Sequence, residues 1–216
     1  FIGNRMLMPR QVEAMKLLME GATPQQIDKV HVDFGMPMGP FTLTDEVGID
    51  VGYKVANILH QAYGERHAVA DLLTVMYTDL HLTGTKGGRG FYVHDGRQLQ
   101  LNPDLDPTLK KIRVSRNRPA QALSDSEIRE RCLLIMINES ARCIEEGIVA
   151  KATHLDLAML MGTGFPPSRG GPLHYAQSLG VQMVVDRLRH YEAIHGPRFA
   201  PTQLLIDHAR DGRALC

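Results

Sequence analysis

The sequence predicts an all-α protein made of two homologous helical bundles in tandem. Two observations predict this fold. Apolar residues recur at helical spacing in almost every segment, and nothing alternates in the manner of strands. The residue pattern of the first half also returns in the second half. The one expected exception to the helical fold is a short extended piece at residues 91–93.

Composition sets the broad class of the protein. A chain of 216 residues fits one large or two small domains, and 44% apolar with 22% charged residues is ordinary for a globular protein. Lys+Arg 24 balance Asp+Glu 24, which argues against a nucleic-acid partner. No window of 18 uninterrupted apolar residues occurs, so we expect no membrane span.

The three cysteines are expected to be reduced. Cys132 and Cys143 fall in one predicted helix at a separation of about 16 Å, which is beyond the reach of a disulfide. With Cys216, they indicate structural thiols in a cytosolic or organellar compartment. The ten histidines show no metal-ligand spacing, and His60, His67, His190 and His195 are expected on the surface, so no metal site is predicted.

The first predicted helix ends at Gly21 and carries Met8, Val12, Met15 and Met19 on one face. Pro9 either begins this helix or kinks it. Thr23 and Gln26 form a capping box that opens a second helix.

A rigid apolar loop at 34–41 follows the second helix. Helices are then expected from Pro40 or Thr42 to Gly48, from Val51 to Tyr63 with Asp50 as the cap, and over residues 69–80. Gly84–Gly90, with four glycines, is interpreted as a tight turn. A phosphate-binding loop is the less favoured alternative, because no strand–loop–helix unit surrounds it.

The second half begins after a polar connector with one short helix near 107–114. Ser124 and Glu127 form a capping box for a long helix that ends at Gly147. Thr153 with Asp156 is expected to cap the next helix, and a second rigid loop spans 162–172. The last three helices are predicted over 172–180, over 181–191, and from Pro201 to near Gly212.

The two halves match at constant offsets. Glu13 and Glu139 are 126 residues apart, as are Glu20-Gly21 and Glu146-Gly147. After an insertion in the second rigid loop, the offset becomes 132, as the pair Gly39-Pro40 and Gly171-Pro172 shows. We therefore predict a first helical domain over 1–95, a connector over 96–123 and a second domain over 124–216, packed like a pseudo-dimer.

The repeat also separates scaffold from candidate function. Arg5 matches Arg131, whereas Asn4 matches Glu130, so Asn4 is not part of the duplicated scaffold. The counterpart of the capping residue Ser124 would precede Phe1. We therefore expect Phe1 to lie inside a helix that begins upstream, in a longer protein.

Five motifs occur in a fixed order: Phe-Ile-Gly-Asn-Arg at 1–5, Glu-Gly-Ala-Thr-Pro-x-x-Ile-Asp at 20–28, Phe-Gly-Met-Pro-Met-Gly-Pro-Phe at 34–41, Gly-x-Lys-x-Gly-x-Gly-Phe-Tyr at 84–92 and Gly-Phe-Pro-Pro-x-Arg-Gly-Gly-Pro at 164–172. In combination they resemble the C-terminal part of the 3-hydroxyacyl-CoA dehydrogenases over residues 1–216. The duplication resembles that of the multifunctional fatty acid oxidation proteins. The resemblance implies helical domains of the type found at the C-terminus of 6-phosphogluconate dehydrogenase.

The resemblance implies NAD-dependent oxidation of a 3-hydroxyacyl-CoA to a 3-ketoacyl-CoA in β-oxidation. NAD and the family's catalytic His–Glu pair would belong to an upstream domain absent from this chain, so the chain alone is expected to be inactive. The family's active-site Asn falls on Asn4, whose amide would bond the reacting oxygen or position the catalytic His. The alternative is a helix-flanking Asn that bonds backbone.

The apolar loop is the expected substrate wall. Its proline and methionine side chains would line the acyl chain, although plain packing between helices is an equal alternative; the residues are Met36, Pro37, Met38, Gly39 and Pro40. No residue here is assigned to NAD or to a metal.

The resemblance also implies partners. These are the acyl-CoA substrate, upstream NAD-binding and enoyl-CoA hydratase domains, and a thiolase subunit, in the bacterial cytoplasm or an organellar matrix. The competing interpretation is a non-catalytic assembly module, and a third is a different β-hydroxyacid dehydrogenase that shares this helical half.

Overall fold

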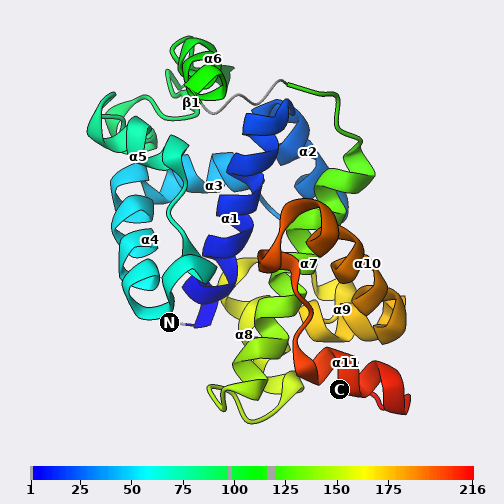
Figure 1. Cartoon of the computed structure of the whole chain (residues 1–216). Helices are drawn as coiled ribbons and strands as arrows, with labels where there is room; N and C mark the ends of the chain where they lie inside the picture. The colour runs from blue at the N-terminus through cyan, green and yellow to red at the C-terminus, as the bar shows by residue number, and fades with distance from the viewer. Residues whose placement is uncertain (1, 97–98, 116–119) are drawn as a thin grey trace. The chain divides into compact units, whose positions relative to one another are not determined.

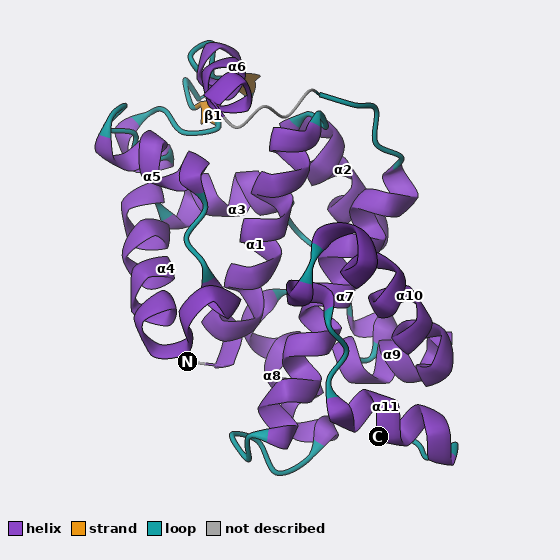
Figure 2. Cartoon of the chain, viewed as in Figure 1, coloured by secondary structure: helices purple, strands orange, loops and turns teal. Residues whose placement is uncertain are grey.

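The computed structural model describes residues 2–96, 99–115 and 120–216, and this part of the chain is helical almost throughout (Figures 1 and 2). The expected all-α class is confirmed. The α-helices are α1 (Ile2–Glu20), α2 (Pro24–Phe34), α3 (Pro40–Val47), α4 (Ile49–Tyr63), α5 (Asp71–Thr78), α6 (Leu105–Ser115), α7 (Asp125–Glu145), α8 (Ala152–Thr163), α9 (Pro172–Leu179), α10 (Val181–His195) and α11 (Gln203–Asp211). Short 3-10 turns lie at Gly64–His67, Thr85–Gly87, Pro167–Arg169 and Pro197–Phe199. No helix among these is both long and apolar enough to cross a membrane.

The chain divides into two compact units. Unit 1 holds the residues up to Arg10 together with Glu130–Cys216, and unit 2 holds Gln11–Arg129. Helices α1 and α7 therefore each contribute residues to both units. The domain boundaries expected from the repeat, at residues 95 and 124, stay a prediction, and Phe1 lies outside the described residues.

The repeat is visible in the order of elements. Helices α1 to α5, with the 3-10 turn at 64–67, are followed after the connector by α7 to α11, with the 3-10 turn at 197–199. Matched glycines end matched helices, since Gly48 and Gly180 follow α3 and α9, and Gly64 and Gly196 follow α4 and α10.

Buried charge fixes the start of α1 in unit 1. The Arg5 guanidinium is fully buried, and its Nε lies 2.7 Å from Glu139 Oε1 while its Nη2 lies 2.7 Å from Glu146 Oε2. Burial alone would lower the pKa of Arg5, but the hydrogen bonds to the two glutamates and the charge of Glu139 raise it above its ordinary value. Glu139 lies on α7 and Glu146 directly follows the last residue of that helix, seven positions later, so a single guanidinium reaches both.

The predicted caps are partly confirmed. Thr23 Oγ1 accepts a hydrogen bond from Gln26 N at 3.2 Å, and Ser124 Oγ accepts one from Glu127 N at 3.2 Å. The short helix of the connector is present as α6. Helix α1 begins before Pro9, so a helix start at that proline is ruled out.

Two other capping predictions are wrong. Helix α4 begins at Ile49, so Asp50 lies in its first turn and pairs instead with Lys86. Helix α8 begins at Ala152, which places Thr153 inside the first turn, and Asp156 serves a different helix, as described below.

The expected extended piece is β1 (Tyr92–Val93), which is confirmed. It pairs antiparallel with β2 (Gln100–Leu101), and Tyr92 lies opposite Leu101. Strand β2 was not expected, because two residues are too few to show alternation.

One of the four histidines expected on the surface differs from that prediction. His67 is buried and its ring lies 5.0 Å from that of Tyr63, centroid to centroid. It belongs to the 3-10 turn after α4 and so shares no helix with His60.

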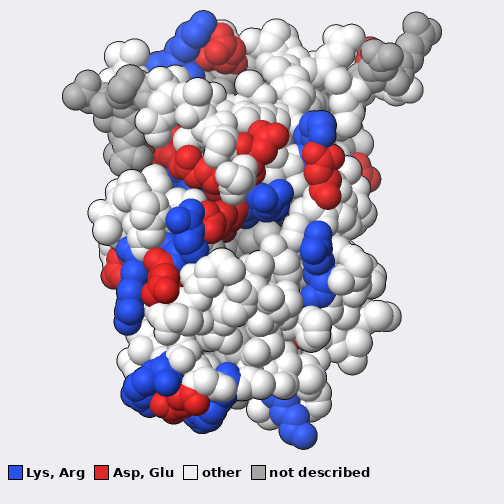
Figure 3. Space-filling view, turned by 90° about the vertical axis from the view of Figure 1, so that its right-hand side faces the viewer, with Lys and Arg blue, Asp and Glu red and all other residues white. Residues whose placement is uncertain are grey.

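Basic and acidic side chains lie next to one another on the face drawn in Figure 3, in keeping with the balanced composition.

Candidate functional site

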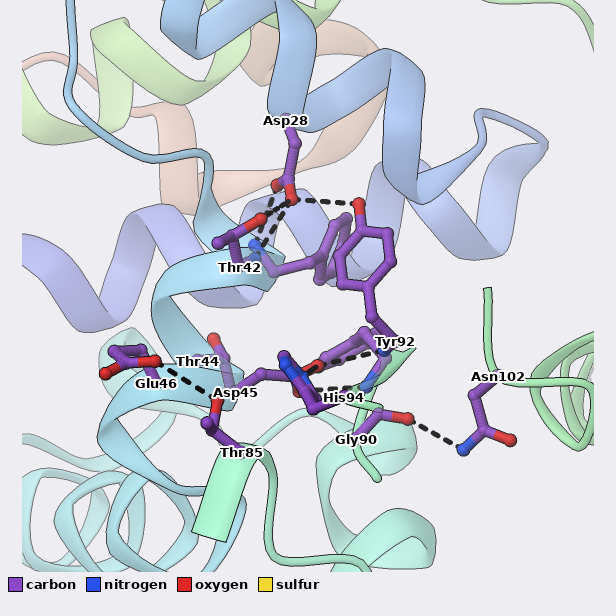
Figure 4. Close-up of polar contacts among 12 residues, drawn as sticks. Asp28, Thr42, Thr44, Asp45, Glu46, Thr85, Gly90, Tyr92, His94 and Asn102 are labelled. Carbon is purple, nitrogen blue, oxygen red and sulfur yellow. Dashed lines mark hydrogen bonds and ion pairs between the residues drawn. The ribbon is translucent and has the colours of Figure 1, made fainter. Parts of the chain in front are cut away.

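The best-defined polar cluster of unit 2 is centred on Asp28, in α2 (Figure 4). Its Oδ1 accepts a hydrogen bond from Phe41 N at 2.8 Å, and its Oδ2 accepts from Thr42 N at 3.0 Å and from Thr42 Oγ1 at 2.7 Å. Phe41 and Thr42 form the first turn of α3, where backbone N–H groups have no partner within the helix. Asp28 therefore caps α3 from a neighbouring helix and fixes the point at which the apolar loop enters it.

Tyr92 connects this cluster to β1. Its hydroxyl donates a hydrogen bond to Asp28 Oδ2 at 2.9 Å. Burial, followed by the charge of Asp28, raises the pKa of Tyr92 far above its ordinary value. The hydroxyl therefore keeps its proton and acts as a donor.

A second buried carboxylate, Asp45 on α3, holds the chain just before and within β1. It accepts hydrogen bonds from Phe91 N at 2.8 Å and Tyr92 N at 2.9 Å, and His94 Nε2 lies 2.9 Å from it. Burial raises the pKa of Asp45, although the bonds from His94 and from the two backbone N–H groups act in the opposite direction.

The glycines of Gly84–Gly90 serve this close approach. A Cβ on Gly90 would lie 1.9 Å from Asp45 Oδ1, and one on Gly84 would lie 2.2 Å from the Asp45 carbonyl oxygen. Thr85–Gly87 is a 3-10 turn, and Gly88 N donates to the Thr85 carbonyl at 3.0 Å. The segment is the tight turn that the sequence favoured.

Gly84–Gly90 does not fit the pyrophosphate of NAD. A dinucleotide-binding turn connects a strand to the N-terminus of a helix, whereas this segment lies between α5 and β1. Both of its cations form ion pairs, Lys86 with Asp50 and Arg89 with Asp104. These residues are therefore given no part in binding NAD.

The apolar loop 36–40 is held at both ends. Met36 N donates to the His31 carbonyl at 3.1 Å, and the Pro40 carbonyl accepts from Gln11 Nε2 at 2.7 Å. Gly39 sits against α2, since a Cβ there would lie 2.3 Å from the Asp28 Cα.

Between these ends, the predicted substrate residues differ in exposure. Met36, Gly39 and Pro40 are buried, Met38 is half-buried and Pro37 is exposed. Pro37 and Met38 are thus the members of the loop that present accessible surface.

Asn4, the predicted catalytic residue, lies in the first turn of α1 and belongs to unit 1. It is exposed, and its amide makes no hydrogen bond to any described residue. The loop belongs to unit 2, so Asn4 and the loop are described separately, each within its own unit.

The counterpart of Asn4 in the repeat is fully bonded. Glu130 accepts hydrogen bonds from Arg187 Nε at 2.6 Å and from Tyr191 OH at 2.7 Å. Burial would raise the pKa of Glu130, but these bonds and the charge of Arg187 lower it overall. The second copy therefore uses this position for structure.

Two carboxylates of the site escaped the sequence reasoning, and the repeat held a signal for one of them. Ile27-Asp28 and Leu155-Asp156 match, and each precedes a Gly-Pro pair. Asp156 accepts from Leu173 N at 2.8 Å and from His174 N at 2.9 Å, in the first turn of α9. Asp45 has Gln177 as its counterpart and gave no such signal.

Clusters of three or more His, Cys, Asp or Glu side chains able to hold a metal ion were not found among the described residues. Thiol chemistry has little support there as well, because Cys132 and Cys143 are buried and Cys216 has an elevated pKa of about 12.

Comparison with known proteins places both copies. The model of the 3-hydroxyacyl-CoA dehydrogenase C-terminal domain matches residues 1–94 and 128–214. The fatty acid oxidation complex subunit alpha of Vibrio cholerae serotype O1 is 39% identical over 209 residues. That match covers 97% of this chain but 29% of the relative, so the chain spans less than a third of the relative's length.

Solved structures share the fold. The 3-hydroxybutyryl-CoA dehydrogenase of Escherichia coli K12 superposes with a TM-score of 0.79 at 20% identity, over 97% of this chain and 59% of that one. The dehydrogenase part of multifunctional enzyme 1 from C. elegans gives a TM-score of 0.73 at 26% identity, over 96% of this chain and 47% of that one. With the family model matched over most of its length, the chain belongs to the 3-hydroxyacyl-CoA dehydrogenase family and carries the family's C-terminal domain in two copies.

Proposed function

We propose that this chain is the substrate-side helical part of an NAD-dependent 3-hydroxyacyl-CoA dehydrogenase that interconverts 3-hydroxyacyl-CoA and 3-ketoacyl-CoA in fatty acid oxidation. The match of both copies to the family's C-terminal domain is the observation that carries this proposal. The Vibrio cholerae relative, a fatty acid oxidation complex subunit alpha, supports the setting.

In this proposal NAD and the catalytic His–Glu pair belong to a part of the longer enzyme outside these residues. NAD would accept the hydride there. This chain would contribute an amide near the reacting oxygen and an apolar wall for the acyl chain. An enoyl-CoA hydratase domain and a thiolase subunit are proposed partners, in the bacterial cytoplasm or an organellar matrix.

Asn4 is the proposed contact with the reacting centre. Its amide is exposed and without a hydrogen-bond partner among the described residues, whereas its counterpart Glu130 is held by Arg187 and Tyr191. An amide N–H aimed at an oxygen on which charge develops stabilises the transition state more than the ground state. The same amide would serve equally to orient the catalytic imidazole.

Pro37 and Met38 are the proposed acyl contacts. The loop that carries them is fixed at Met36 and Pro40, so its accessible surface is preset rather than formed on binding. A preset apolar surface lowers the entropic cost of binding a flexible acyl chain.

The first test uses the chain by itself. We expect the purified 216-residue chain to show no oxidation of NADH with acetoacetyl-CoA, because the Gly84–Gly90 turn does not fit the dinucleotide and the catalytic His–Glu pair is assigned to another part of the enzyme. Measurable turnover would contradict the assignment of NAD and the catalytic pair to another part of the enzyme.

The second test uses the longer enzyme and the variant Asn4→Ala. Loss of one donor to a developing oxyanion should lower kcat on the order of 100-fold. The matched control is Asn57→Ala, which removes an amide that donates to the Tyr53 carbonyl within α4 and should leave kcat within about twofold.

The competing function is an assembly module, and the same variant separates it from the catalytic role. Lost turnover with an unchanged oligomeric state and unchanged thiolase binding supports the catalytic role. Full turnover of Asn4→Ala, together with weakened assembly on surface substitutions, supports the module.

A further inference from the structure

We infer that Asp28, with Tyr92, is a positioning residue for the acyl chain: it fixes the shape of the Met36–Pro40 loop and thereby sets how strongly long acyl chains bind. This inference rests on the proposed function of the loop. It concerns a residue that touches neither the substrate nor the reacting atoms.

The argument begins with the repeat. Asp28 and Asp156 occupy matching places, and each accepts two backbone N–H hydrogen bonds from the helix that follows a Gly-Pro pair. In both copies a glycine makes room for the carboxylate. A Cβ on Gly39 would lie 2.3 Å from Asp28 Oδ1, and one on Gly171 would lie 2.5 Å from Asp156 Oδ1. Capping is thus the shared, structural part of the arrangement.

The first copy adds two strong donors to this shared part. Thr42 Oγ1 and Tyr92 OH both bond Asp28 Oδ2, at 2.7 and 2.9 Å. In the second copy His174 replaces Thr42, and its ring faces the Arg169 carbonyl instead. The place of the tyrosine hydroxyl is taken by Cys216 Sγ, 3.5 Å from Asp156 Oδ2, and a thiol is a much weaker donor.

The additional donors act on the loop. Asp28 holds Phe41 and Thr42, which directly follow Pro40, and Gly39 packs on the Asp28 backbone. The other end of the loop is fixed by the left-handed Gly35 and by the bond from Met36 N to His31. The accessible residues Pro37 and Met38 lie between these two anchors, so movement of Asp28 would move the surface they present.

The direction of the effect follows from the geometry. Replacement of Asp28 by Asn keeps one acceptor for Phe41 N but turns an NH₂ group toward the donors of Thr42 and Tyr92. The cap then weakens at the loop end of α3. Displacement of a binding surface by about 1 Å costs affinity only for ligands that reach it. A long acyl chain would reach the loop, and the acetoacetyl group would not.

The experiment compares Asp28→Asn with Asp156→Asn in the longer enzyme. For each variant, kcat and KM are measured with NADH and one of two substrates. One is acetoacetyl-CoA, and the other is a 3-ketoacyl-CoA with an acyl chain of about 16 carbons, chosen to span the loop. The melting temperature of each variant is measured as well. We expect Asp28→Asn to raise KM for the long substrate about fivefold or more while KM for acetoacetyl-CoA and both kcat values stay within about twofold. Asp156→Asn should lower the melting temperature about as much as Asp28→Asn does, but it should not change the ratio of the two KM values.

Tyr92→Phe and Met38→Ala make the result decisive. Tyr92→Phe removes only the hydroxyl and should shift the KM ratio in the same direction by a smaller factor, which keeps a test available if Asp28→Asn does not fold. Equal KM ratios in Asp28→Asn and Asp156→Asn, or a wild-type ratio in Tyr92→Phe when Asp28→Asn is insoluble, would overturn the inference. If Met38→Ala shifts the ratio while those variants do not, the proposed role of the loop stands and only the positioning role fails. If Met38→Ala is also without effect, the proposed role of the loop fails.

Discussion

Arg5 on α1 and Glu139 on α7 form a buried ion pair, with 2.7 Å between Nε and Oε1 and side-chain exposures of 0% and 6%. Glu146 makes the second contact to the same guanidinium. The guanidinium and the Glu139 carboxylate are buried in unit 1, and Glu146 is partly exposed, so the start of α1 is sensitive to single substitutions of Arg5 or Glu139.

Arg5→Ala should destabilise the protein strongly. The substitution leaves Glu139 buried without its main counter-charge, and such a change costs about 3–5 kcal/mol. Urea unfolding followed by circular dichroism measures the loss. The control is Lys29→Ala, which removes the exposed ion pair with Asp33 and should change the free energy of unfolding by less than about 0.5 kcal/mol. Similar losses in both variants would contradict the role of the buried pair.

Gly39→Ala should be far more disruptive than an alanine at a helical glycine of the same unit. The added Cβ would lie 2.3 Å from the Asp28 Cα, so α2 or the loop must shift, at a cost of about 1–3 kcal/mol. Gly52 lies within α4, where the nearest atom to an added Cβ is 4.0 Å away. Gly52→Ala should therefore be neutral or stabilising by up to about 1 kcal/mol. Melting temperatures of the two variants measure the contrast, and equal shifts would argue against the tight contact with Asp28.

Glu130 should contribute a pH-dependent part of the stability. Because the pKa of Glu130 in the folded protein lies below its ordinary value of 4.5, its contribution is present above that pH and is lost as the pH falls through the folded-state pKa. The free energy of unfolding should therefore exceed that of Glu130→Gln by a constant amount at neutral pH, and the difference should shrink in acid.

Urea unfolding of the protein and of Glu130→Gln, measured from neutral pH down to about pH 3, the practical limit of such titrations, tests this expectation. Tyr191→Phe removes one of the two residues that donate to Glu130, so its free energy of unfolding should depend less on pH in this range than that of the unmodified protein. A difference that stays constant down to the lowest pH would exclude Glu130 as the titrating group.

Cys216 should react slowly with alkylating reagents although it is the exposed cysteine. Partial burial of the thiol, together with the charge and hydrogen bond of Asp156, raises the pKa of Cys216 to about 12. The thiolate is therefore scarce at pH near 8, and each unit by which the pKa falls increases it about tenfold.

The variant Asp156→Asn should increase the rate of Cys216 alkylation by iodoacetamide several-fold, measured by mass spectrometry of the folded protein. Asp207→Asn, which alters another carboxylate of unit 1, should leave the rate unchanged. Cys132 and Cys143 are buried and should stay unmodified in both variants. An unchanged rate in Asp156→Asn would show that the aspartate does not control the thiol.

The sequence predicted features that depend on neighbouring residues. Helices ended where Gly48, Gly64 and Gly180 predicted, because a helix stop is a local property of the backbone. The caps Thr23 and Ser124 were recognised for the same reason: their partners lie three residues away.

Contacts between distant residues were not predictable in this way. Asp28 and Tyr92 are 64 residues apart, and neither periodicity nor spacing connects them. Asp156 was assigned to the start of its own helix, since the local rule favours an acid near a helix N-terminus, whereas tertiary packing turns its carboxylate to α9. The repeat offered indirect help, because an acid that recurs before Gly-Pro in both halves is more economically explained by a shared contact than by chance.

The division of α1 between the two units has a consequence for how the chain can be cut. Residues up to Arg10 belong with Glu130–Cys216. A cut within the connector would therefore leave Arg5 on one fragment and its partners Glu139 and Glu146 on the other. Neither half expressed alone would then contain all the partners of its own interior. The halves 1–123 and 124–216, produced together, should recover the native fold by fragment complementation, in which each half acts as the folding template of the other.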